Sequence, residues 1–144
     1  MRRSLLTLAC VGWLVGTASV SVAQQVPTID VRRPTIVAFF PPVPQSVLVN
    51  DPDTNEALSD FQVYARALRP SLAKKGIDFQ EVYTRSFKVK CGGAVTTFAP
   101  GDRVLGYYLI APDRPPRVEY GVRTDTDLLQ IANEYFAIEP QAAK

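Results

Sequence analysis

The sequence predicts a single α/β domain in which helices cover the faces of a central mixed β-sheet. Two observations predict this class. An apolar, β-rich segment is followed by an amphipathic helix and another strand, and two strand-like segments then precede a second helix. The first unit favours parallel strands, and the second favours an antiparallel hairpin. We expect the domain to occupy residues 24–144, with its core over about residues 34–138.

The first strand is expected at Thr35–Phe40, where every residue after the threonine is apolar. A run of this kind is typical of a strand buried on both faces of a parallel or mixed sheet. The prolines of Pro41–Pro44 end it, because proline cannot donate a hydrogen bond to a neighbouring strand. Residues 24–34, which precede the strand, are interpreted as an extended leader.

The first helix is expected to begin with Asp53 as its N-cap and Glu56 three residues later, a variant of the capping box. The segment Lys74–Gly76 ends it, because cations and a glycine are favoured at a helix C-terminus. Pro70 lies inside the helix and is expected to kink or divide it. The helix has one apolar face, formed by Leu58, Phe61, Ala65, Leu68 and Leu72.

A further strand is expected after this helix at Ile77–Tyr83. Phe87, Val89 and Cys91 then alternate with polar residues, as in a half-buried strand or a continuation of the preceding one. The glycines after Cys91 end this segment, and residues 94–103 are interpreted as a loop.

A β-hairpin and a second helix complete the predicted domain. The hairpin strands are Val104–Ala111 and Val118–Val122, and residues 112–117 form the turn. The helix is capped within Thr124–Asp127 and stops at Pro140. Its expected buried face consists of Leu128, Leu129, Ala132, Tyr135 and Phe136.

Residues 1–23 have the three parts of a cleavable signal peptide. Arg2 and Arg3 supply the positive region, Leu5–Val20 is apolar or small, and Ser21–Ala23 places small side chains before the cleavage site. The sequence therefore predicts an exported protein, which we expect in the periplasm or otherwise outside the cell.

The N-terminal segment has two alternative interpretations, a retained transmembrane anchor and a lipoprotein signal. A retained transmembrane anchor needs roughly 20 apolar residues, whereas this run has about 16. A lipoprotein signal would acylate Cys10, but Thr7 stands where its sequence box favours leucine. We therefore expect no membrane insertion after cleavage.

Cleavage changes the chemistry of the remaining chain. Arg2 and Arg3 account for the whole formal net charge of +2, so the domain is neutral and has no charge bias towards nucleic acid. Loss of Cys10 leaves Cys91 as the only thiol, so no intramolecular disulfide can form. The absence of histidine excludes the usual Ser-His-Asp and Cys-His systems and disfavours zinc, copper and haem sites. We expect no metal and no cofactor.

The order of elements over about residues 34–138 resembles that of the thioredoxin-like superfamily. Ile36–Phe40 resembles the central strand that precedes the active-site loop of that family. Gly106–Ala111 and Val118–Val122 resemble its late hairpin, and a last helix follows. The resemblance implies a three-layer sandwich with helices flanking one central mixed sheet.

Both halves of that family's redox site are missing. Members carry a Cys-x-x-Cys motif after the central strand, whereas residues 41–53 contain no cysteine. Members also carry a cis-proline before the late hairpin, whereas Val104, Leu105 and Gly106 stand there in this chain. The resemblance therefore implies a degenerate domain without redox activity.

The segment Pro41–Ser46 follows the central strand, where the superfamily usually binds its partners. Its prolines lower the entropic cost of ordering a binding loop. The alternative is a rigid loop that only ends the strand. The candidate binding residues are Phe39, Phe40, Pro41, Pro42, Pro44 and Ser46.

Cys91 is the candidate reactive residue, because it could form a mixed disulfide with a partner or with a second copy. The neighbouring Lys88 and Lys90 would stabilise a negatively charged sulfur. The alternative is a half-buried thiol that packs as a small apolar group.

Acidic and aromatic residues have structural explanations. Helix capping accounts for most of the acidic residues Asp51, Asp53, Glu56, Asp60, Asp125 and Asp127. Packing accounts for the tyrosines Tyr107, Tyr108, Tyr120 and Tyr135.

These observations predict a binding or accessory module that contacts a protein or peptide of the cell envelope, and not an enzyme. One alternative is a single-cysteine thiol protein that acts through mixed disulfides at Cys91. The other is a structural subunit of an envelope assembly, which predicts a stable oligomer.

Overall fold

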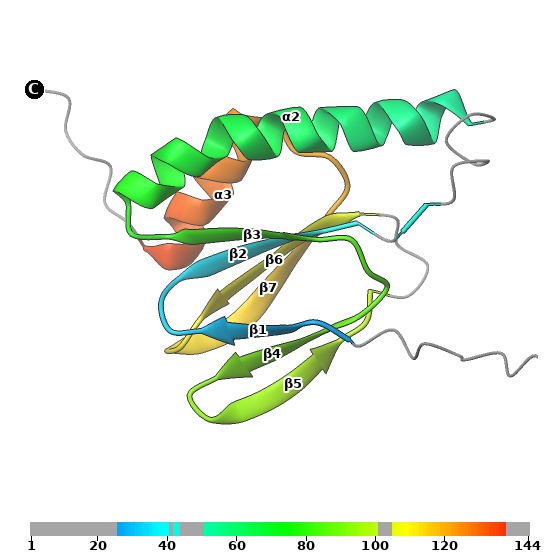
Figure 1. The fold of residues 1–144 in the computed structure, drawn as a ribbon. Coiled ribbons are helices and arrows are strands. Elements are labelled where there is room, and N and C mark those ends of the chain that lie inside the picture. The colour runs from blue at the N-terminus through cyan, green and yellow to red at the C-terminus, as the bar shows by residue number, and fades with distance from the viewer. Residues whose placement is uncertain (1–25, 41, 44–50, 101–104, 138–144) are drawn as a thin grey trace, which may run out of the picture.

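The computed structural model describes residues 26–40, 42–43, 51–100 and 105–137. These residues form three layers: two helices, a four-stranded sheet beneath them, and a three-stranded sheet beneath that (Figure 1). The expected signal peptide, residues 1–23, lies outside the described part of the chain. Neither described helix has the length and apolarity needed to cross a membrane.

The middle layer is a mixed sheet with the strand order β3-β2-β6-β7. Its strands are β2 (Thr35–Phe39), β3 (Asp78–Val82), β6 (Gly106–Ala111) and β7 (Arg114–Tyr120). β2 pairs in parallel with β3 and antiparallel with β6, and β6 pairs antiparallel with β7. The predicted α/β class, the parallel pair and the late hairpin are therefore confirmed.

The turn of the late hairpin is shorter than predicted. Ala111 pairs with Arg114, so only Pro112 and Asp113 form the turn, and the prolines that follow lie inside β7. Proline is tolerated in this strand because β7 is the edge of the sheet, where an amide group can face away from the neighbouring strand.

Both helices cover the same face of the middle sheet (Figure 1). They are α2 (Pro52–Lys74) and α3 (Asp125–Phe136), and they also contact each other. The predicted apolar faces are confirmed, with Leu58, Leu129 and Tyr135 partly buried at their margins. The fully buried residues of the two helices are Phe61, Ala65, Leu68, Leu72, Leu128, Ala132 and Phe136.

A second sheet covers the opposite face, and the expected single central sheet with helices on both faces is therefore wrong. Its strands are β1 (Thr28–Val31), β4 (Phe87–Cys91) and β5 (Ala94–Phe98), in the order β1-β4-β5. β4 was predicted, whereas β1 lies in the expected leader and β5 in the expected loop. Each missed strand is short and contributes few inward side chains, so its alternation is weak in the sequence.

The two sheets enclose a second core rich in aromatic rings. Phe39 of the middle sheet lies with its ring centroid 5.3 Å from that of Phe98. Phe98 stacks on Tyr108 at 4.2 Å, and Phe87 meets Tyr108 edge-on at 5.9 Å. Because β5 contributes Phe98 to this cluster, the hairpin formed by β4 and β5 is anchored by packing as well as by its ladder.

Helix α2 begins two residues earlier than predicted. Its N-cap is Asp51, whose side chain accepts hydrogen bonds from the backbone N–H of Thr54 at 3.3 Å and from its hydroxyl at 2.6 Å. Pro52 occupies the first turn, where its missing N–H costs nothing. The predicted N-cap, Asp53, is instead an acidic residue of the first turn. The helix also runs through the exposed Pro70, so the expected division there is not seen.

The C-terminal end of α2 and the start of α3 match the prediction. Lys75 is the C-cap of α2, and Gly76 follows with a φ of 72°, a conformation that favours glycine. Thr124 caps α3 and accepts a hydrogen bond from the N–H of Asp127 at 3.1 Å. α3 ends at Phe136, and Pro140 lies outside the described residues.

Replacing Asp51 by alanine is expected to lower the free energy of unfolding at neutral pH, because α2 loses its N-cap. The hydrogen bonds from Thr54 hold the pKa of Asp51 below its usual range. The stabilisation is therefore present at neutral pH and is lost as the pH falls through that lowered pKa. Urea denaturation of both proteins should give curves that differ at neutral pH and converge in acid.

Asp53→Ala is the matched control, because Asp53 lies in the same helical turn without capping it. We expect this variant to lose less stability than Asp51→Ala at neutral pH. Equal losses for the two variants would show that the assignment of the N-cap is wrong.

Candidate functional site

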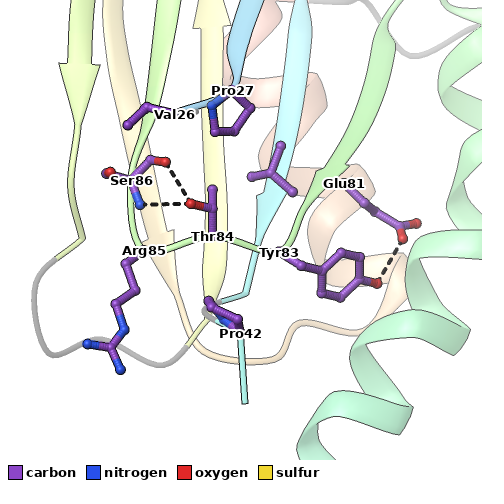
Figure 2. A pocket seen from close by; sticks show the side chains of 9 residues that line it. Val26, Pro27, Pro42, Glu81, Tyr83, Thr84, Arg85 and Ser86 are labelled. Atoms are coloured by element: carbon purple, nitrogen blue, oxygen red, sulfur yellow. Dashed lines mark hydrogen bonds between the residues drawn. The ribbon is translucent and has the colours of Figure 1, made fainter. Parts of the chain in front are cut away.

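The described residues form a pocket of about 700 Å³ where the chain crosses from the middle sheet to the second sheet (Figure 2). Three segments meet there. Pro42 follows β2, residues 81–86 run from the end of β3 to the start of β4, and Val26 and Pro27 precede β1. Because β2 and β3 are parallel, their carboxyl ends open on the same side, which is where open α/β sheets commonly bind ligands.

Tyr83 forms the aromatic wall of the pocket, and its side chain is held in place by helix α2. The Tyr83 hydroxyl donates a hydrogen bond to Glu81 at 3.1 Å and accepts one from Gln62 at 3.3 Å. Arg69 of α2 forms an ion pair with Glu81 at 2.8 Å. The residue remains 45% exposed, and partial burial raises its pKa above the usual tyrosine value. The Tyr83 ring is therefore held in one orientation and remains accessible to solvent or to a ligand.

Arg85 supplies a cation at the opposite side of the pocket. Figure 2 shows Tyr83 and Arg85 on either side of Thr84, with Pro42 facing this connection. The Thr84 hydroxyl donates to the Ser86 carbonyl at 2.9 Å and accepts from the Ser86 N–H at 3.4 Å, which fixes the turn. Arg85 is exposed and forms no ion pair with another described residue.

The pocket combines groups suited to binding. An aromatic ring and prolines offer apolar contact, and a guanidinium offers a partner for a carboxylate. Within the described part of the chain, no three His, Cys, Asp or Glu side chains gather as metal ligands. The arrangement can therefore hold a ligand through apolar and charged contacts.

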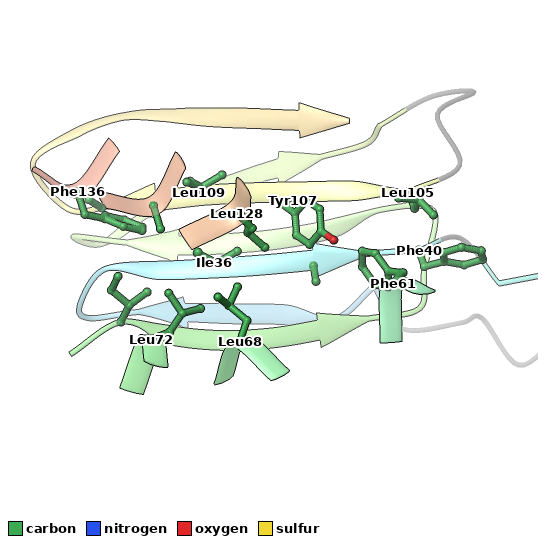
Figure 3. Packing of buried hydrophobic residues seen from close by; sticks show 14 residues of the cluster. Ile36, Phe40, Phe61, Leu68, Leu72, Leu105, Tyr107, Leu109, Leu128 and Phe136 are labelled. Carbon is green, nitrogen blue, oxygen red and sulfur yellow. The ribbon is translucent and has the colours of Figure 1, made fainter. Parts of the chain in front are cut away.

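The predicted binding residues are only partly brought together here. Pro42 lines the pocket, whereas Pro41, Pro44 and Ser46 lie outside the described residues. Phe39 is 0% exposed and belongs to the second core. Phe40 is 1% exposed and packs against Phe61 of α2 at a centroid distance of 6.1 Å, on the helix side of the sheet (Figure 3). Neither phenylalanine presents a surface to a partner in this structure.

Cys91 lies at the end of β4 as a free, partly buried thiol. Its side chain packs against the second core, on the same face of the strand as Phe87 and Val89. Lys88 and Lys90 project from the opposite, exposed face. This placement favours the packing interpretation, because the two cations lie across the strand from the sulfur.

Several of the acidic residues and tyrosines singled out in the sequence are placed by capping and packing. Asp51 caps α2, and Asp125 and Asp127 lie in the first turn of α3. Tyr107 stacks on Phe61 at 5.3 Å in the first core, and Tyr108 belongs to the second core.

Tyr83 and Arg85, which shape the pocket wall, were not among the predicted site residues. Tyr83 was assigned to a strand that in fact ends at Val82. A signal was available, because four consecutive polar or aromatic residues separate two strands there. The sequence does not show that β3 and β4 belong to different sheets, and this crossing is what places the connection at the wall of a pocket.

We found no family model that matches the chain, and no significant similarity to a curated protein or to a solved structure.

Replacing Tyr107 by phenylalanine is expected to stabilise the protein by about 1 kcal/mol at neutral pH. The Tyr107 hydroxyl is buried and makes no hydrogen bond of ordinary geometry with a described residue. Burial raises the pKa of Tyr107 to about 12, an effect that the nearby backbone of Arg123 only partly offsets. In the wild type, Tyr107 therefore contributes a loss of stability as the pH rises from 10.0, the ordinary pKa of tyrosine, towards 12, and the variant lacks this contribution.

Tyr108→Phe is the control at neutral pH, because the buried side-chain atoms that lack a hydrogen-bond partner include the Tyr107 hydroxyl but not the Tyr108 hydroxyl. At alkaline pH this variant also loses a contribution, because burial raises the pKa of Tyr108 as well. Thermal unfolding at neutral and alkaline pH measures both variants. A destabilised Tyr107→Phe protein would indicate that the hydroxyl has a hydrogen-bond partner and would contradict this assignment.

Proposed function

We propose that the protein is an exported, non-catalytic binding module that holds an extended peptide segment of a cell-envelope protein in the pocket beside Tyr83. Export rests on the signal-peptide pattern of residues 1–23. The periplasm is the proposed compartment, and an extracellular location is the alternative.

The pocket wall formed by Tyr83 is the observation that carries this proposal. An exposed large aromatic side chain costs solvation free energy unless a partner covers it, and aromatic residues dominate the energetics of protein interfaces. The Tyr83 hydroxyl accepts a hydrogen bond from Gln62 of the neighbouring helix and donates one to Glu81, which is itself ion-paired with Arg69 of that helix. Because the ring is held in this way, little conformational entropy is lost when a ligand packs on it.

Arg85 and the prolines define the chemistry of the ligand. Pro42 and Pro27 offer rigid apolar surfaces beside the tyrosine ring, which suit an extended or proline-containing segment. Arg85 suits a carboxylate on that segment, from a side chain or from a chain end. The ligand is therefore proposed to be an extended peptide with an apolar residue next to an acidic group.

A thioredoxin-like origin of the domain belongs to the same proposal. It is supported by the parallel unit β2–α2–β3 and by the unit β6–β7–α3 within one mixed sheet. The second sheet departs from that plan. No peptide bond of the described residues is cis, and Cys91 lies on the second sheet, away from α2. Redox activity is therefore not part of the proposal.

Site-specific crosslinking tests the pocket. A photoreactive amino acid placed at position 83 in the exported chain is expected to capture a cell-envelope partner, whereas the same probe at Val63, which is 57% exposed on α2, is not. The charge reversal Arg85→Glu is expected to weaken the purified complex by about tenfold or more, the effect of losing one central interface contact.

Cys91→Ser separates this function from the thiol alternative. We expect the serine variant to capture the same partner in equal yield, because Cys91 packs in the second core and does not line the pocket. Loss of capture in this variant would favour mixed-disulfide chemistry. Equal capture at positions 83 and 63 would contradict a specific site.

A further inference from the structure

The two sheets have four edge strands, and three of them carry features that discourage pairing with another chain. β3 contains the charged residues Asp78 and Glu81, and β7 contains Pro115 and Pro116. β1 is only four residues long. β5 differs from all of these, because its sequence AVTTF contains neither a charge nor a proline.

The geometry of the hairpin shows which groups of β5 are available. Gly92 and Gly93 have φ values of 56° and 88° and form a two-residue turn, so Cys91 and Ala94 flank it as a pair. Hydrogen-bonded and non-hydrogen-bonded pairs alternate along an antiparallel ladder. Starting from the pair at the turn, the N–H and C=O groups of Val95 and Thr97 point away from β4, and no described strand pairs with them.

The outer face beside this edge is positively charged. Lys88 pairs across the ladder with Thr97, and Lys90 pairs with Val95, so all four side chains share the exposed face. Neither lysine forms an ion pair with a described residue. The Val95 side chain is 57% exposed, so no described residue covers the edge of β5 beside the lysines.

We propose that the free edge of β5 binds an acidic, extended segment of another protein as an added fourth strand of the second sheet. The backbone groups of Val95 and Thr97 would supply the main-chain hydrogen bonds of this strand addition. Lys88 and Lys90 would reach across Val95 and Thr97 to carboxylates on the outer face of the added strand.

Charge complementarity favours this occupant over a second copy of the chain. Two β5 edges paired about a twofold axis would bring four lysines onto one face of a continuous sheet. Asp30 of β1 is paired with Lys90 on that face, but it already forms an ion pair with Arg32 at 3.0 Å. An acidic strand removes that repulsion. This surface lies on the opposite edge of the second sheet from β1, whose preceding residues line the pocket, and so it goes beyond the proposed pocket function.

Amide hydrogen exchange on the whole mature chain tests the proposal. The probe is a short blocked peptide of alternating glutamate and valine, and the matched control peptide has lysine in place of each glutamate. At a concentration about ten times its Kd, the acidic peptide is expected to slow exchange at Val95 and Thr97 roughly tenfold. The basic peptide is expected to leave both rates unchanged.

Two variants make the test specific. The double charge reversal Lys88→Glu and Lys90→Glu lies on the exposed face and is expected to transfer the protection to the basic peptide. Thr97→Pro removes an outward N–H and is expected to abolish the protection that the acidic peptide gives. Thr97→Val keeps this N–H and is expected to retain the protection. Tyr83→Ala is expected to leave edge binding intact, which separates this surface from the pocket.

Several results would overturn the proposal. Protection by neither peptide, equal protection by both, or no change of preference in the charge-reversed variant would each remove the acidic-strand assignment. A stable dimer of the chain alone, with Val95 and Thr97 already protected and released by Thr97→Pro, would assign the edge to a second copy instead.

Discussion

The strand β2 must be buried on both of its faces, and the rest of the architecture depends on this constraint. Ile36 and Ala38 point into the core beneath the helices, whereas Val37 and Phe39 point into the core between the sheets. A strand of this composition is stable only if each face of its sheet receives a complete cover. α2 and α3 supply one cover, and the sheet of β1, β4 and β5 supplies the other.

The sequence predicted the elements whose patterns are strong and local. The continuous apolar run of β2, the apolar face of α2 and the late hairpin were all predicted with small errors at their ends. β1 and β5 were missed because β1 contributes only Ile29 and Val31 to the second core and β5 contributes only Phe98. The prediction of helices on both faces came from the order of elements and its resemblance to the thioredoxin-like plan, whereas the sheet that contains the two missed strands is what covers Val37 and Phe39.

The candidate site was harder to predict than the fold, because it depends on where the chain changes sheets. Phe39 and Phe40 are apolar residues beside a proline-rich segment, and in sequence they resemble a binding surface. In the structure both are almost completely buried, Phe39 at the end of β2 in the second core and Phe40 directly after it in the first core. Tyr83 and Arg85 are accessible because they lie in the connection between β3 and β4, which belongs to neither sheet and is covered by neither core.

The parallel pairing of β1 with β4 also has a consequence for how the chain folds. It joins Thr28 to Lys88, whereas the hairpins of β4 with β5 and of β6 with β7 close over two-residue turns. Long loop closures are entropically costly, and such non-local pairings form slowly. β1 is therefore expected to join after both hairpins have formed, and until it does, the aromatic face that carries Phe39 and Tyr108 lacks one of its three covering strands. A slow, non-local pairing thus controls how long a folding chain exposes one of its two apolar cores.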